Sequence, residues 1–228
     1  MATFCLLHGG WLEPSCWEPL ADRLRDRGHQ ALTPDLPLDD PRAGHADRTR
    51  PALEALGATT DQVIVVGHSA SSGYAALAAD HVPGALLVHL CPRLGPFSSP
   101  PGAPPPFREG IPFPADRADG TTVWDPEVAI ETLYPRLPSA VARALADRLR
   151  PLAPPADEFP LTGHPDVPTA LIYAADDELF DPAWERLMAT EVLLIEPIEI
   201  PGGHFPMLED PDSLVEILEG TERDAGPG

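Results

Sequence analysis

Short apolar runs alternate along the chain with segments whose apolar residues recur at helical spacing. Trp17, Leu20, Ala21 and Leu24 show the helical pattern, and Gly28 follows where such a helix would end. This alternation is typical of a parallel sheet with helices on both faces. It predicts one α/β domain with a six-stranded, mostly parallel sheet. The predicted strands are Ala2–Leu7, Gln30–Thr33, Gln62–Val66, Ala85–Leu90, Thr169–Ala174 and Ile195–Ile200.

Three helices in the second half of the chain are predicted to begin with an Asp-Pro pair, at Asp125, Asp181 and Asp210. An Asp before a helix accepts hydrogen bonds from its unpaired N–H groups, and Pro fits the first helical position. Earlier helices are predicted around Leu53 and over Ala70–Asp80, which fill the remaining gaps between strands.

Residues 92–114 interrupt the alternation, because nine of these 23 residues are Pro. The segment lies between two predicted core strands, and two helical patterns follow it. We predict that residues 92–165 form a small Pro-rich cap over one end of the sheet, which sets substrate size. The core would then comprise residues 1–91 and 166–228. The alternative is a long surface loop without a function.

The charge balance excludes several kinds of partner and chemistry. The 228 residues include 36 acidic and 15 basic residues, for a formal net charge of −21. Nucleic acids and anionic membranes are bound mainly through Lys and Arg, so both are poor partners. The chain has no Lys, which excludes Schiff-base, PLP and P-loop lysines. The expected partner is a small-molecule substrate, and no metal or cofactor is implied.

Three cysteines, Cys5, Cys16 and Cys91, form no CxxC pair and favour buried thiols over disulfides or metal ligands. No apolar run reaches the roughly 20 residues that span a bilayer. The first residues lack the basic region of a secretory signal. We therefore expect a cytoplasmic protein. The absence of Lys and Asn, whose codons are A/T-rich, suggests a high-GC and hence bacterial genome.

The first segment with catalytic character is Gly67–Ser71, between an apolar strand and an Ala-rich helix. A Gly-x-Ser-x-small sequence in that setting is typical of a nucleophile elbow, so Ser69 is the predicted nucleophile. We reject Ser71 as the nucleophile, because the strand is predicted to end at Val66 and Ser71 would lie within the helix. His68 either lines the substrate pocket or packs in the core.

Two glycines follow the first strand, at Gly9 and Gly10, and Trp11 comes next. Glycines there let the backbone turn its N–H groups toward a reacting carbonyl. Together with the N–H of Ala70, the N–H of Gly10 or Trp11 is predicted to form an oxyanion hole. The alternative is an ordinary Gly turn. The neighbouring Leu12 is expected to line the substrate pocket.

His204 follows the last predicted strand on a Gly-flanked loop, which suits a general base. The next residue, Phe205, is expected to line the substrate pocket. A carboxylate must hold the imidazole in the correct tautomer, and the loop after the fifth strand contains Asp176, Asp177 and Glu178. Asp177 is the favoured acid, and Asp176 stays open as the alternative.

The chain order of nucleophile, acid and histidine is that of the α/β-hydrolases, which this sequence resembles along nearly its whole length. His8–Trp11 is similar to the oxyanion region of a small esterase and hydroxynitrile lyase-like branch, and Leu32–Pro37 is similar to its next strand end. The resemblance implies the α/β-hydrolase fold with strand order 2-1-3-4-5-6. Family members place the acid three residues after a Gly. Ala174 holds that position here, which points to Asp177 and leaves Asp176 open.

We therefore expect a serine hydrolase that cleaves an ester, thioester or lactone of a neutral, largely apolar small molecule through an acyl-enzyme. Neutrality is expected because the chain has no Lys and no Arg beside the catalytic motifs except Arg93. The alternatives are a cyclase or lyase on the same fold, or an inactive binding protein. Cyanohydrin lyases of this branch carry a Lys after the catalytic His, where this chain has Phe205. Aromatic and Leu side chains expected at the pocket are Trp11, Leu12, Phe97, Phe107, Phe113 and Phe205.

Overall fold

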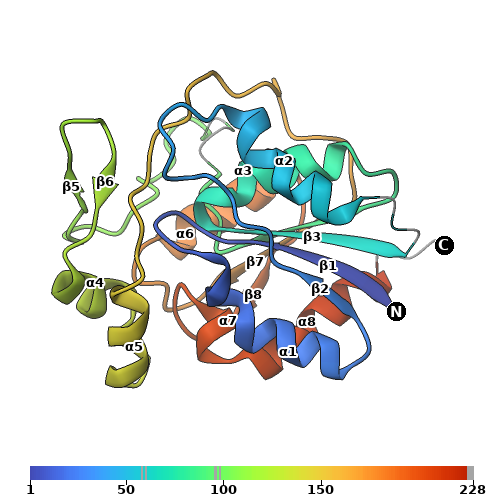
Figure 1. The fold of residues 1–228 in the computed structure, drawn as a ribbon. Helices are drawn as coiled ribbons and strands as arrows, with labels where there is room; N and C mark the ends of the chain where they lie inside the picture. The colour runs from blue at the N-terminus through green and yellow to red at the C-terminus, as the bar shows by residue number, and fades with distance from the viewer. Residues whose placement is uncertain (58, 60, 95–96, 98, 225–228) are drawn as a thin grey trace.

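Six parallel strands form the central sheet of the computed structural model, which describes residues 1–57, 59, 61–94, 97 and 99–224. The strands lie in the order β2-β1-β3-β4-β7-β8, which confirms the order that the resemblance implies (Figure 1). Their bounds are β1 (Ala2–Leu7), β2 (Gln30–Leu32), β3 (Gln62–His68), β4 (Leu86–Leu90), β7 (Thr169–Ala174) and β8 (Ile198–Ile200).

Helices cover both faces of this sheet (Figure 1). The larger ones are α1 (Glu18–Asp26), α2 (His45–Leu56), α3 (Ser72–Asp80), α6 (Pro182–Leu187) and α8 (Pro211–Asp224). Along β1, Phe4 and Leu6 pack with α1 and α8 on one face, whereas Cys5 and Leu7 pack with α2 and α3 on the other. Alternate residues of a strand point to opposite faces, so a continuously apolar strand serves two cores.

Shorter helical segments connect these elements. They are η1 (Pro14–Trp17), η2 (Ser69–Ser71), a π-helix η3 (Met188–Leu193) and α7 (Pro206–Glu209). The predicted caps are confirmed, because Asp125, Asp181 and Asp210 each accept a hydrogen bond from a backbone N–H in the following first turn, at 2.9, 2.9 and 3.1 Å. No helix in the described part of the chain is long and apolar enough to cross a membrane.

The prediction that the last strand begins at Ile195 is wrong. Leu194 adopts a left-handed conformation with a φ of 57°, and the N–H of Ile195 bonds to the carbonyl of Ala189 at the end of η3. Pro197 has no N–H to donate to a sheet. The strand therefore begins only at Ile198.

The middle part of the segment between β4 and β7 lies on the side of the sheet opposite the chain termini (Figure 1). It contains the hairpin β5 (Ala115–Asp116) and β6 (Thr122–Val123) and two helices, α4 (Pro126–Leu133) and α5 (Ser139–Ala146). Thr122 pairs with Leu152 through two backbone hydrogen bonds of 2.8 and 2.9 Å. The indole of Trp11 donates to the Thr122 hydroxyl at 3.0 Å, so the segment lies against the loop after β1.

Gly67 provides a test of the packing between β3 and α3. A Cβ on this residue would lie 2.5 Å from the Ala75 Cβ and 2.9 Å from the Ser71 carbonyl oxygen. We expect Gly67→Ala to lower the free energy of unfolding by about 1–3 kcal/mol, as overpacked cores do. Urea denaturation measures this loss. Gly163→Ala is the control, since no atom lies within 4 Å of the added Cβ. Equal stability of the two variants would contradict the close approach.

Candidate active site

Ser69 lies at the turn between β3 and η2 in a left-handed conformation, with a φ of 51°. Residues with a Cβ rarely adopt this conformation, and such strain is concentrated at functional sites. The turn is held by its own backbone, because the Ser69 carbonyl accepts hydrogen bonds from the Ser72 hydroxyl at 2.8 Å and from the Arg93 N–H at 3.0 Å. The local geometry is that of a nucleophile elbow.

Ser71, the other serine considered as nucleophile, is fully buried in the first turn after the elbow. Its hydroxyl donates a hydrogen bond to the backbone carbonyl of His8. This bond ties the elbow to the loop that follows β1. A hydroxyl engaged in this way supports a structural role for Ser71 and leaves Ser69 as the candidate nucleophile.

The Gly loop after β1 lies directly against the elbow. A Cβ on Gly9 would come within 3.2 Å of the Ser69 Cβ, and one on Gly10 within 3.5 Å of the Ala70 Cβ. Trp11 has a φ of 62°, which turns the backbone sharply at this point. The N–H of Ala70 belongs to the start of a helix, where such groups have no intrahelical acceptor. The structure thus brings together the three residues predicted to form the oxyanion hole.

His204 and Asp177 form a buried pair after β8 and β7. The His204 Nδ1 lies 2.7 Å from Asp177 Oδ2. The other carboxylate oxygen accepts hydrogen bonds from the N–H groups of Leu179 and Phe180, at 2.7 and 2.8 Å. A carboxylate oxygen that accepts the Nδ1–H of His204 fixes the tautomer in which Nε2 presents a lone pair toward a nucleophile.

The three adjacent acids have different environments. Asp177 is fully buried, whereas the side chain of Asp176 is 62% exposed and lies 3.5 Å from a guanidinium nitrogen of Arg136. Glu178 pairs with Arg136 and accepts from the N–H of His204 at 3.3 Å. The structure therefore brings Asp177, and not Asp176, to the ring of His204, while Glu178 holds the backbone of the same loop.

His68 connects the elbow to His204. Its Nε2 lies 2.9 Å from the His204 carbonyl oxygen, and the two rings are 4.8 Å apart. Burial, and to a lesser degree His204, lowers the pKa of His68 well below its usual value, so the neutral ring donates its Nε2–H to that carbonyl. Among the described residues, no hydrogen bond joins the Ser69 hydroxyl to His204. Catalytic hydrogen bonds are often long without substrate and shorten when it binds.

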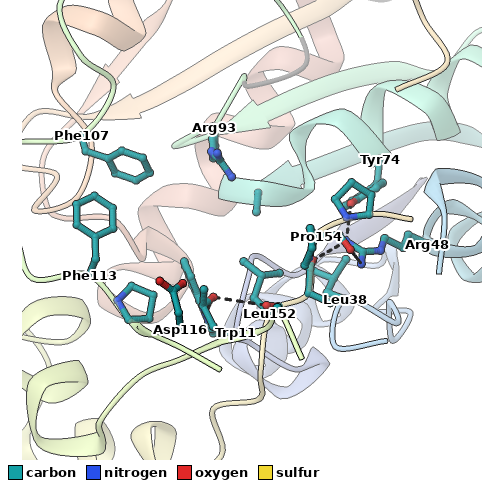
Figure 2. A pocket seen from close by; sticks show the side chains of 16 residues that line it. Trp11, Leu38, Arg48, Tyr74, Arg93, Phe107, Phe113, Asp116, Leu152 and Pro154 are labelled. Atoms are coloured by element: carbon teal, nitrogen blue, oxygen red, sulfur yellow. Dashed lines mark hydrogen bonds between the residues drawn. The ribbon is translucent and has the colours of Figure 1, made fainter. Parts of the chain in front are cut away.

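A cavity of about 660 Å³ opens beside the elbow (Figure 2). Trp11 and Ala70 line it, together with side chains from the segment between β4 and β7. Phe107, Phe113 and Leu152 form part of its apolar wall, and the rings of the two phenylalanines are 5.1 Å apart. The cavity therefore adjoins the predicted oxyanion residues and offers an apolar surface for a substrate.

Several residues expected at the pocket lie elsewhere. His68 and Phe205 pack on the His204 ring, with centroid distances of 4.8 and 4.9 Å, and do not line the large cavity. Leu12 lines a separate small cavity beside Cys16. Being next to a catalytic motif in the sequence therefore does not show whether a side chain faces the large cavity or the core.

Arg48 lines the cavity and was missed by the sequence analysis. It is 1% exposed and donates to the Tyr74 hydroxyl at 3.0 Å and to the carbonyls of Ala153 and Pro154 at 3.1 and 2.9 Å. These bonds hold the segment before β7 against α2. No sequence signal marks an Arg that is buried by tertiary packing. Arg93, the one arginine that the sequence placed beside the catalytic motifs, lines the same cavity.

Cys91, Asp177 and His204 form the one group within the described residues whose donor atoms are close enough to hold a metal, all within 4.8 Å. Burial, with Asp177 adding, raises the pKa of the Cys91 thiol well above its usual value. A protonated thiol is a poor metal ligand. Since Asp177 and His204 already bond to each other, the donor set favours a catalytic pair over a metal site.

The strand order and the position of these groups at the carboxyl ends of parallel strands define the α/β-hydrolase class. A model of the alpha/beta hydrolase family matches residues 6–217, and the chain belongs to that family.

Solved structures with the same fold include polyneuridine aldehyde esterase, with 19% identity and a TM-score of 0.77 over 96% of this chain and 98% of that one. A methylesterase from Arabidopsis has 20% identity and a TM-score of 0.75, over 98% and 100% of the two chains. A pyrethroid hydrolase from Sphingobium faniae has 20% identity and a TM-score of 0.74, over 97% of each. A sequence comparison with curated proteins gives no match. At these identities, the likeness establishes the fold.

Glu185 is a second buried carboxyl group near Asp177. It is fully buried on α6, and neither of its side-chain oxygens has a hydrogen-bond partner among the described residues. Burial raises its pKa well above its usual value, and the charges of Asp177 and Asp181 add to the shift. A buried carboxyl group without hydrogen-bond partners disfavours the charged form, so Glu185 stays protonated.

The raised pKa predicts a pH-dependent effect of Glu185→Gln on stability. Above the unfolded pKa of about 4.5, the unfolded chain loses a proton that the folded chain keeps, so stability falls as pH rises, by at most about 1.4 kcal/mol per pH unit. Glu185→Gln should therefore match the wild type near pH 4 and exceed it at pH 8. Urea midpoints at both pH values measure this difference.

The control is Glu191→Gln, an exposed glutamate on the neighbouring η3, which should behave like the wild type at both pH values. A change in stability of Glu185→Gln that is the same at pH 4 and pH 8 would contradict a protonated Glu185.

Proposed function

We propose that this protein is a serine hydrolase that cleaves an ester, thioester or lactone of a small, largely apolar molecule. The observation that carries the proposal is the buried pair of His204 and Asp177 beside a strained Ser69 elbow. Membership of the α/β-hydrolase family and the esterase and hydrolase names of structural neighbours support the same class. No observation favours a cyclase or lyase over hydrolysis.

In the proposed reaction, the Ser69 hydroxyl attacks the substrate carbonyl while Nε2 of His204 takes its proton. Asp177 stabilises the imidazolium that forms. The N–H of Ala70 and that of Gly10 or Trp11 stabilise the oxyanion. His204 then protonates the leaving group, and water activated by the same histidine hydrolyses the acyl-enzyme.

The proposed substrate site is the cavity beside the elbow, with residues 92–165 as a cap over it. Support comes from the side chains that this segment contributes to the cavity, including Phe107 and Phe113, and from its hydrogen bond to Trp11. An apolar wall of this kind suits a hydrophobic acyl or alcohol group. The proposed partner is therefore a small molecule.

Covalent labelling tests the nucleophile. A fluorophosphonate probe is expected to add one adduct per chain, located on Ser69 by peptide mass mapping. Ser69→Ala should abolish both labelling and ester hydrolysis. Ser71→Ala is the control and should keep labelling, since its hydroxyl is bonded to the His8 carbonyl. An adduct that persists in Ser69→Ala would refute the assignment.

The adjacent Asp176 and Asp177 provide a matched pair of variants that tests which acid assists His204. Asp177→Asn is expected to lower kcat by roughly 10⁴-fold, because an amide at that position stabilises the wrong histidine tautomer. Asp176→Asn makes the same chemical change at an exposed residue and should leave kcat within about threefold of the wild type. Steady-state rates with a p-nitrophenyl ester measure both. A crippling effect of Asp176→Asn instead would mean that the acid is assigned to the wrong residue.

A further inference from the structure

Arg93 extends from the loop after β4 to the cavity beside the elbow. Figure 2 shows it between the rings of Phe107 and Phe113 on one side and Tyr74 on the other. Its backbone N–H bonds to the Ser69 carbonyl at 3.0 Å, so its position is fixed relative to the candidate nucleophile. Arg93 and Ala70 also line a second cavity of about 310 Å³, and thus lie where two cavities adjoin.

The guanidinium of Arg93 has neither an ion pair nor a hydrogen bond within the described residues. Arg93 is solvent-exposed, and ten other arginines of the chain pair with a carboxylate. Asp116 lines the same cavity, yet it lies beyond the 4 Å of an ion pair with Arg93. In a chain with 36 acidic residues, one cavity-lining arginine retains its full hydrogen-bonding capacity.

Arg48, the other arginine that lines the cavity, has both terminal nitrogens of its guanidinium already engaged in hydrogen bonds. The donors of Arg48 are engaged by Tyr74 and by backbone carbonyls, so that side chain serves the fold. Arg93 instead stacks near the ring of Phe107, with the guanidinium carbon 6.0 Å from the ring centroid. Stacking on an aromatic ring orients a guanidinium while leaving its N–H edge open to a ligand.

We propose that Arg93 binds a carboxylate carried by the substrate, so that the preferred substrates are esters that retain a free carboxylate group. The inference rests on the proposed hydrolase function and replaces the expectation of a neutral substrate. A planar guanidinium matches a carboxylate through two parallel hydrogen bonds. The ester carbonyl would lie at Ala70 and the carbon chain against Phe107 and Phe113.

The acidic surface does not oppose this assignment at close range. The net charge of −21 repels anions at a distance, but salt screens that field beyond about 8 Å at physiological ionic strength. A guanidinium in contact with the ligand acts inside that length. The arrangement therefore selects for an anion within the cavity rather than by attraction from solution.

The test compares half-esters of succinate, glutarate and adipate with their neutral amide analogues, which have the same shape. We expect kcat/KM of the wild type to favour the carboxylate for at least one chain length. Arg93→Gln should lower this carboxylate-to-amide ratio about ten- to hundredfold, the effect expected for a hydrogen-bonded charge pair. Arg93→Lys, which keeps the charge and loses the fork, should lower it less.

The matched control is Arg117→Gln, which removes the same charge from an exposed position in the β5–β6 turn that does not line the cavity. It should leave the ratio at the wild-type value. An equal fall in Arg117→Gln, or an unchanged ratio in Arg93→Gln, would overturn the proposal.

Binding measurements separate this inference from the proposed reaction. In a Ser69→Ala background, calorimetry should show tighter binding of the half-ester than of its amide, and Arg93→Gln should remove that difference. Charge-selective binding without turnover in the wild type would contradict the hydrolase and support the carboxylate site. Turnover of neutral esters without charge-selective binding would do the opposite.

Discussion

The buried carboxylate of Asp177 is the constraint on which the rest of the site depends. An ionised group removed from water is stable only when its oxygens are fully hydrogen-bonded. Two N–H groups at the start of the segment before α6 satisfy one oxygen, and the ring of His204 satisfies the other. Burial, with Asp177 adding, raises the pKa of the neighbouring Glu185 and keeps it protonated. One carboxylate thus fixes the β7 loop and the imidazole tautomer.

The parallel sheet brings these groups together, since all its strands end at the same edge. Ser69 follows β3, Asp177 follows β7 and His204 follows β8, although up to 135 residues separate them in sequence. Gly9 permits the loop after β1 to approach the elbow. The segment between β4 and β7 then supplies the apolar wall of the cavity. The sheet thereby positions the candidate catalytic groups, and a separate segment lines the cavity beside them.

Sequence patterns predicted what is encoded locally. The strands, the Asp caps and the elbow depend on short-range preferences, and they agree with the structure apart from element ends such as Ile195. The strand order came from the family resemblance. The sequence favoured Asp177 but left Asp176 open, because adjacent carboxylates differ only in which one the fold buries. The burial of Arg48 and the unpaired state of Arg93 depend on contacts with distant segments, which no local pattern records.

The central claim is that Ser69, His204 and Asp177 act as one catalytic unit, and a mutant cycle tests it most directly. Residues of such a unit are strongly non-additive, so once Ser69 is lost, further loss of His204 or Asp177 should change the remaining rate little. The measurement is kcat/KM for Ser69→Ala, His204→Ala, Asp177→Asn and their combinations on one ester. Our account predicts that the triple variant retains about the rate of Ser69→Ala. Effects that multiply across the combinations would show that the three residues act independently, which would contradict it.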